Sequence, residues 1–276
     1  MDFTELQGFR EGVYSCFTRS RDALMNVFDA LSTETAAHSF VELSLSPFFD
    51  RRWPSLYEAF QDGRLDRSEL RRVIAASAPS PPEGKRWVLA LDASSIARPA
   101  SPTARDRSSQ YVHNLPSCPS PVTPGGSFSA LVLLPEECSS WTSILDNQRI
   151  ETKQTPTEGA QKQLRAVVPL LPAPPLGLGD RGYGNAAFVQ ATKDLPCDGL
   201  LRISRDRVFY RAAPLPTGKR GAPKKDGSRF KCSDPSPHGV PDSVWEGVDA
   251  KGGRIEGARW TDLHFKQCRD PTVSVL

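Results

Sequence analysis

Two short apolar runs, each ending in an aspartate, constrain the fold of this chain most. The first runs from Trp87 to Leu91 and is followed by Asp92; the second covers residues 176–179 and is followed by Asp180. Runs of this length predict strands that are buried on both faces of a sheet. A carboxylate at the end of such a strand faces the crevice where open sheets bind ligands. Two such carboxylates from different strands form a minimal set of oxygen ligands for a divalent cation. The alternative is that each aspartate only forms the turn at a strand end, which is the more common role of a single aspartate.

The composition excludes several classes of protein. The chain has 276 residues, enough for one or two domains, and its 25 prolines predict compact modules joined by stiff connections. No run approaches the roughly 18 apolar residues of a membrane span, and the N-terminal residues do not form a secretory signal. Six cysteines without a Cys-x-x-Cys pair and four isolated histidines predict reduced cytoplasmic thiols, not a disulfide framework or zinc site.

Positive charge is concentrated in one segment of the chain. The formal net charge is +3, but residues 202–231 carry +8 and the remainder carries −5. Phe209, Tyr210 and Phe230 are interleaved with these cations, which is typical of a surface that binds nucleic acid. A solvated basic loop is the alternative, but the position directly after the second aspartate strand favours a polyanion. The expected DNA-binding residues are Arg202, Arg205, Arg207, Lys219, Arg220, Lys224, Lys225, Arg229 and Lys231.

The N-terminal residues 1–78 are expected to form a helical region. Apolar residues from Phe9 to Leu31 recur at helical spacing and predict one long first helix. A short second helix is expected to end at Gly63, and a third is expected to begin at Asp66 with Glu69 completing its cap. A proline-rich stretch then separates this region from the first aspartate strand.

The order of elements in residues 86–204 predicts a ribonuclease-H-like core. Three strands are followed by a helix, the Asp180 strand, a second helix and a last strand. In a mixed α/β sheet of this order the first and fourth strands are neighbours, so Asp92 and Asp180 are expected to lie side by side. Residues 205–276 are expected to be a β-rich insertion that is basic at its start. The later strands are expected at 128–134, 141–145 and 199–204, and the helices at Thr155 and Asn185.

Five stretches in collinear order resemble the DDE transposases of bacterial insertion sequences, of a kind abundant in cyanobacteria. They are residues 38–47, 140–146, 163–168, 180–184 and 260–265. The resemblance covers essentially the whole chain, and it implies that Asp92 and Asp180 are the first two members of a catalytic Asp-Asp-Glu triad. It also implies two Mg²⁺ or Mn²⁺ ions, double-stranded DNA as partner (element ends and target), a homodimer, and a place in the cytoplasm at the nucleoid.

This sequence departs from the resemblance at the third carboxylate. In such transposases the glutamate lies on a helix beyond the insertion, whereas here the last glutamates, Glu246 and Glu256, fall in expected hairpins. The expectation is a C-terminally truncated transposase that binds one ion weakly and cuts DNA poorly or not at all. The alternatives are a non-catalytic DNA-binding fragment that interferes with full-length transposase, a different two-carboxylate hydrolase, and an unstable remnant.

Overall fold

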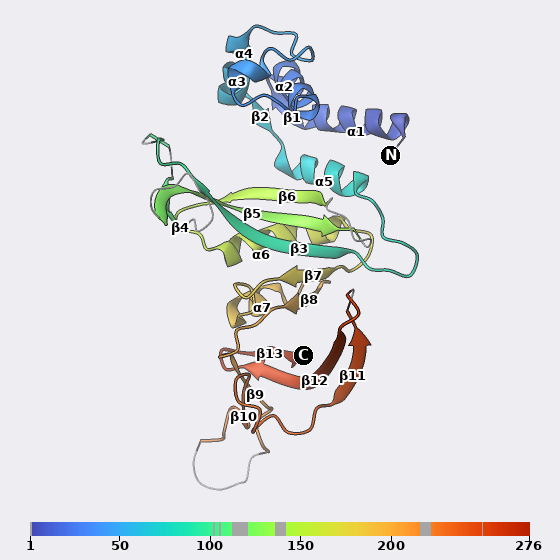
Figure 1. Cartoon of the computed structure of the whole chain (residues 1–276), viewed down its shortest axis with the longest axis vertical. Coiled ribbons are helices and arrows are strands. Elements are labelled where there is room, and N and C mark those ends of the chain that lie inside the picture. The colour runs from blue at the N-terminus through green and yellow to red at the C-terminus, as the bar shows by residue number, and fades with distance from the viewer. Residues whose placement is uncertain are drawn as a thin grey trace. The chain divides into compact units, whose positions relative to one another are not determined.

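A computed structural model describes residues 2–101, 103–104, 106–111, 121–135, 142–215, 222–249 and 251–276 (Figure 1). The chain forms two compact units. The first consists of Met1–Lys85 and Pro169–Ala173, and the second of Arg86–Val168 and Pro174–Leu276. In the described ranges, with their gaps, no helix is long and apolar enough to cross a membrane.

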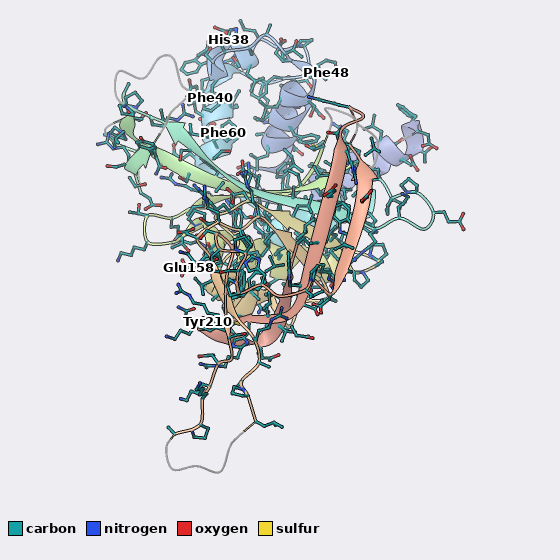
Figure 2. The ribbon with its side chains drawn as sticks, turned by 60° about the horizontal axis from the view of Figure 1, so that its bottom comes forward. His38, Phe40, Phe48, Phe60, Glu158 and Tyr210 are labelled. Carbon is teal, nitrogen blue, oxygen red and sulfur yellow. The ribbon has the colours of Figure 1, made fainter. Side chains whose placement is uncertain are left out.

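The first unit is built from helices packed around two small apolar clusters. One cluster is centred on Leu56 and Ala30, and the other on Val13 and Met25. At the surface Phe40 stacks on Phe60 with ring centroids 5.0 Å apart (Figure 2). The elements are α1 (Phe3–Cys16), β1 (Phe17–Arg19), α2 (Arg21–Thr33), α3 (Phe40–Leu43), α4 (Trp53–Asp62), β2 (Arg64–Leu65) and α5 (Arg67–Ser77).

The prediction of one long first helix is wrong. The chain leaves α1 at Phe17, and Ser20 takes a left-handed conformation with φ of 56° before α2 begins. The intervening β1 pairs with β2, and this pairing replaces the helical hydrogen bonds. Hydrophobic spacing does not reveal the break, because Phe17 remains in the same buried cluster as Val13.

The predicted helix boundaries at Gly63 and Asp66 are confirmed. The Asp66 side chain accepts hydrogen bonds from the backbone N–H groups of Ser68 and Glu69, which have no partner within the helix. Gly63 follows α4 directly, and a Cβ atom there would lie 2.2 Å from the carbonyl oxygen of Ala59. Only glycine therefore fits at this helix end.

The main sheet of the second unit has the strand order of a ribonuclease-H-like fold. The order is β4-β5-β3-β7-β8, with β6 also paired to β5. Strands β3, β5 and β6 pair antiparallel, whereas β3, β7 and β8 pair parallel. The predicted mixed α/β fold is therefore confirmed. The strands are β3 (Val88–Ala97), β4 (Ser108–Tyr111), β5 (Val122–Leu134), β6 (Ser143–Ile150), β7 (Leu176–Gly179) and β8 (Asp198–Leu201).

One helix packs against this sheet, and a second helix packs against the first. Helix α6 (Pro156–Val167) lies on β5 and β6, and α7 (Ala186–Thr192) lies beside α6. Thr155 and Glu158 cap α6 reciprocally, as their spacing predicts, and Asn185 caps α7. A short 3₁₀ turn, η1 (Val168–Leu170), follows α6.

A buried glutamine ties α6 to the sheet. Gln163 is fully buried, and its amide nitrogen donates to the carbonyl oxygens of Ser129 (2.9 Å) and Asp146 (3.2 Å). Its amide oxygen accepts a hydrogen bond of 2.6 Å from the Ser129 hydroxyl. Because these groups lie away from water, each depends on the others for its hydrogen bonds.

A second sheet occupies the C-terminal part of this unit. Its order is β10-β9-β12-β11, with β13 also paired to β12. Glu246 and Glu256 face each other across β11 and β12, and Arg254 bridges both carboxylates at 2.8 and 3.1 Å. The strands are β9 (Val208–Tyr210), β10 (Arg229–Lys231), β11 (Ser243–Val248), β12 (Arg254–Phe265) and β13 (Cys268–Val275).

We expect Gln163→Ala to lower the free energy of unfolding by about 2–4 kcal/mol, because it removes hydrogen bonds and leaves buried partners unsatisfied. Urea denaturation measures this change. Lys162→Ala, an exposed substitution on the same helix, should change the free energy by less than about 0.5 kcal/mol. Equal stabilities of the two variants would show that Gln163 does not tie the helix to the sheet.

Candidate metal and nucleic-acid site

The register of β3 against β7 brings Asp92 and Asp180 side by side. Leu91 pairs with Gly179 in this parallel ladder, so the next register position holds the two aspartates. Paired residues of neighbouring parallel strands point to the same face, and the strands lie about 4.8 Å apart. Both aspartates are exposed, and Asp92 alternates with buried Leu89 and Leu91. Asp92 therefore points to the face of the sheet opposite these leucines, and Asp180 follows the end of the neighbouring strand at the same level.

Asp92 lies within a strand, and the prediction that it ends one is wrong. Strand β3 continues for five residues to Ala97, because Ala93–Ala97 pair with Gly125–Ser129 of β5. Strand β5 in turn begins at Val122, six residues before the predicted start. Only Asp180 follows the end of its strand, and the predicted start of β6 at Trp141 lies outside the described residues.

One carboxylate oxygen of each aspartate accepts no hydrogen bond from the described residues. Asp180 accepts a hydrogen bond of 2.8 Å from the Gly182 N–H through Oδ1, which fixes the turn after β7. The Ser94 hydroxyl lies 3.4 Å from Asp92 Oδ2. Within the described residues, Asp180 Oδ2 and Asp92 Oδ1 make no hydrogen bond, so both can face a ligand. No group of three or more His, Cys, Asp or Glu side chains that could hold a metal occurs in this part of the chain.

Tyr183 is a buried side chain near the two aspartates. The sequence predicts no role for it, although it lies in residues 180–184, one of the stretches that carry the resemblance. Burial raises the pKa of Tyr183 to about 12, with further increases from the negative charges of Asp92 and Asp180 and a smaller opposing effect of Ser129. The phenol oxygen nevertheless has no partner in hydrogen-bonding geometry. Gly179 makes room for this ring, since a Cβ there would lie 3.0 Å from the Tyr183 Cβ.

The predicted DNA-binding residues are spread over β8 to β10 and the segments between them. Arg202, Arg205, Lys224, Lys225 and Arg229 are exposed, and Arg207 and Lys231 are half-buried. Lys219 and Arg220 lie outside the described residues.

The predicted aromatic interleaving of this segment is wrong for two of its three rings. Phe209 and Phe230 are 2% and 1% exposed and form the core of the second sheet with Phe265. Strand alternation places them inside, because their neighbours on β9 and β10 point to the other face. Tyr210 remains half-buried (Figure 2).

Tyr183→Phe should remove an alkaline loss of stability. A pKa raised from 10.0 to about 12 means that the folded state holds the phenol proton more tightly, so its contribution is full below pH 10. That contribution is lost as the pH rises through about 12, by about 3 kcal/mol in total. Urea unfolding of both proteins across this range should show that the wild type loses stability relative to the variant as the pH rises. A constant difference between them would contradict the burial of this phenol beside two carboxylates.

Comparison with known proteins places the chain in a family. Residues 12–264 match the family described as DDE superfamily endonuclease. A cryo-EM structure of a piggyBac transposase synaptic complex with hairpin DNA is similar at 10% identity and a TM-score of 0.34, over 86% of this chain. This chain spans about half of that transposase, 51% of its length. No curated protein matches the sequence. The chain belongs to the DDE superfamily endonucleases.

Proposed function

We propose that this chain carries the core of a DNA transposase that cleaves and transfers phosphodiester bonds with the help of a divalent metal. The observation that supports the proposal is the parallel pairing of β3 with β7, in which Leu91 and Gly179, the residues directly before Asp92 and Asp180, are register partners. Membership of the DDE superfamily endonucleases supports it.

The donor set fits Mg²⁺ or Mn²⁺. Both ions prefer oxygen ligands, and Mg²⁺ keeps several waters and binds through few carboxylates. Asp92 and Asp180 would each offer an oxygen that the surrounding hydrogen bonds leave open. When bound, such an ion activates a water or a DNA 3′-hydroxyl and stabilises the leaving oxygen at a phosphodiester. The chain's own contribution is to hold the two carboxylates in register on a rigid sheet.

Double-stranded DNA is the proposed partner, as element end and as target. The exposed cations Arg202, Arg205, Lys224, Lys225 and Arg229 lie in the same unit as the two aspartates. Contacts from such side chains to phosphates provide affinity without sequence preference. A homodimer on paired ends remains part of this proposal.

A non-catalytic DNA-binding protein is the second candidate. The observation that favours it is that no group of three or more His, Cys, Asp or Glu side chains that could hold a metal occurs within the described residues. Glu246 and Glu256 do not act as the missing third group in this proposal, because both are engaged by Arg254 in their hairpin. With two carboxylates we expect one ion to bind weakly and cleavage to be slow or absent.

Asp92→Asn and Asp180→Asn should each weaken Mn²⁺ binding by at least about tenfold, because each removes a charged ligand. Electron paramagnetic resonance of free Mn²⁺ measures the affinity. Asp262→Asn is a matched control, because Asp262 is exposed and its left-handed backbone, with φ of 54°, also suits asparagine. Equal Mn²⁺ affinity in all three variants would place the metal elsewhere.

A cleavage assay separates the two candidate functions. The protein is incubated with labelled element-end duplex in Mg²⁺ and in Mn²⁺, with Asp92→Asn as the inactive control. DNA binding with little or no Asp92-dependent nicking favours the non-catalytic function. Rapid Asp92-dependent cleavage and strand transfer would establish the catalytic one and contradict the expectation of a weak site.

Lys224→Ala and Lys225→Ala should reduce the salt dependence of duplex binding. Each phosphate contact contributes about 0.9 to the slope of log affinity against log salt. Fluorescence anisotropy at several salt concentrations gives the slope for wild type and the double variant. An unchanged slope would exclude this exposed pair of lysines from the DNA surface.

A further inference from the structure

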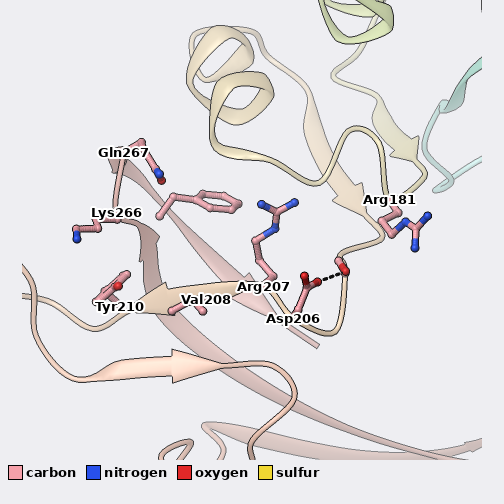
Figure 3. A pocket seen from close by; sticks show the side chains of 9 residues that line it. Arg181, Asp206, Arg207, Val208, Tyr210, Lys266 and Gln267 are labelled. Carbon is pink, nitrogen blue, oxygen red and sulfur yellow. Dashed lines mark hydrogen bonds between the residues drawn. The ribbon is translucent and has the colours of Figure 1, made fainter.

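A basic groove in the second unit includes Arg181, the residue after Asp180, in its lining. It has a volume of about 500 Å³, and its lining includes Arg181, Arg207 and Lys266 as cations and Asp206 as the carboxylate. These cations come from three segments: the turn after β7, the connection between β8 and β9, and the two-residue turn between β12 and β13. Arg207 stands in the middle with Arg181 and Lys266 on its two sides (Figure 3). We call this feature the Arg207 groove.

Asp206 does not neutralise the Arg207 groove. Its carboxylate accepts a hydrogen bond from the Ser204 hydroxyl, shown dashed in Figure 3. That bond, together with a backbone hydrogen bond and the charges of Arg207 and Arg181, lowers the pKa of Asp206. No salt bridge joins Asp206 to Arg207 or Arg181 within the described residues. Three cations against one carboxylate leave a net positive surface.

The central arginine has an unmet hydrogen-bonding group. The Nε–H of Arg207 is shielded from solvent and has no partner among the described residues. A buried donor without an acceptor costs free energy of about 1–3 kcal/mol, and more when the group is charged. An oxygen anion entering the groove would satisfy this donor, and a guanidinium matches the oxygens of a phosphate well.

We propose that the Arg207 groove binds the phosphate backbone of a single DNA strand where that strand reaches Asp180. The inference rests on the proposed function, because Arg181 is the residue next to Asp180. Cations on both sides of Arg207 suit successive phosphates along a strand. Tyr210 also lines the groove and offers a ring on which a base can stack.

Binding of labelled oligothymidylate, followed by fluorescence anisotropy in EDTA, tests the groove without metal chemistry. Arg207→Gln and Lys266→Gln should each lower the salt slope by about 0.7, the value for one contact to a single strand. Arg207→Lys keeps the charge and should retain the slope. Lys251→Gln is the matched control, because Lys251 is exposed on the β11–β12 turn and does not line the groove.

The outcomes separate the groove from the proposed function. Thermal unfolding identifies any variant that fails to fold, in which case the other position carries the test. If wild type binds single strands and neither substitution changes the slope, the groove proposal is wrong while the transposase proposal stands. If wild type binds no DNA at all, the proposed function fails as well. Binding of inorganic phosphate that depends on Arg207, without any effect on oligothymidylate, would make this a free-anion site and overturn the strand assignment.

Discussion

The parallel pairing of β3 with β7 positions the polar groups of the candidate site. These strands are separated in sequence by β4, β5, β6 and α6, and their register pairs Leu91 with Gly179, the residues directly before Asp92 and Asp180. A register shift of one residue would turn one carboxylate to the opposite face. The buried leucines of β3 oppose such a shift, because a shift of this strand would turn them out of the core. The core thus controls the site through geometry, not through direct contact with a substrate.

The aspartate pair and the Arg207 groove carry opposite charges within the second unit. The aspartate pair concentrates negative charge near Tyr183, whereas the Arg207 groove, which includes Arg181, concentrates positive charge. A cation suits the first place and a phosphate backbone suits the second. A strand held by the groove would lead a phosphodiester toward the metal and would itself offset charge there. Asp180 and Arg181, which are adjacent in the sequence, belong to these two oppositely charged places.

Local signals in the sequence predicted the helix caps and the order of the core strands well. Asp66, Thr155 and Asn185 each act within their own helix, so spacing alone was sufficient to locate them. The break at Ser20 and the extension of β3 past Asp92 depend on pairing with distant segments, which periodicity does not record. The Arg207 groove was missed for a similar reason, because Lys266 joins Arg181 only after two sheets have formed. Phe209 and Phe230 were assigned to a surface because their cationic neighbours obscured the strand alternation.

The packing beside Asp180 depends on the absence of a side chain at Gly179. It stands between β8 and the ring of Tyr183, where even a methyl group would lie 2.9 Å from Leu201. An exchange to alanine there would alter no charge, no ligand and no hydrophobic pattern. It would nevertheless crowd the Leu201 side chain and the Cβ atom of Tyr183, and both would have to shift to make room. A substitution that leaves Asp92 and Asp180 in place can therefore still disturb the packing beside the turn in which the Gly182 N–H holds Asp180.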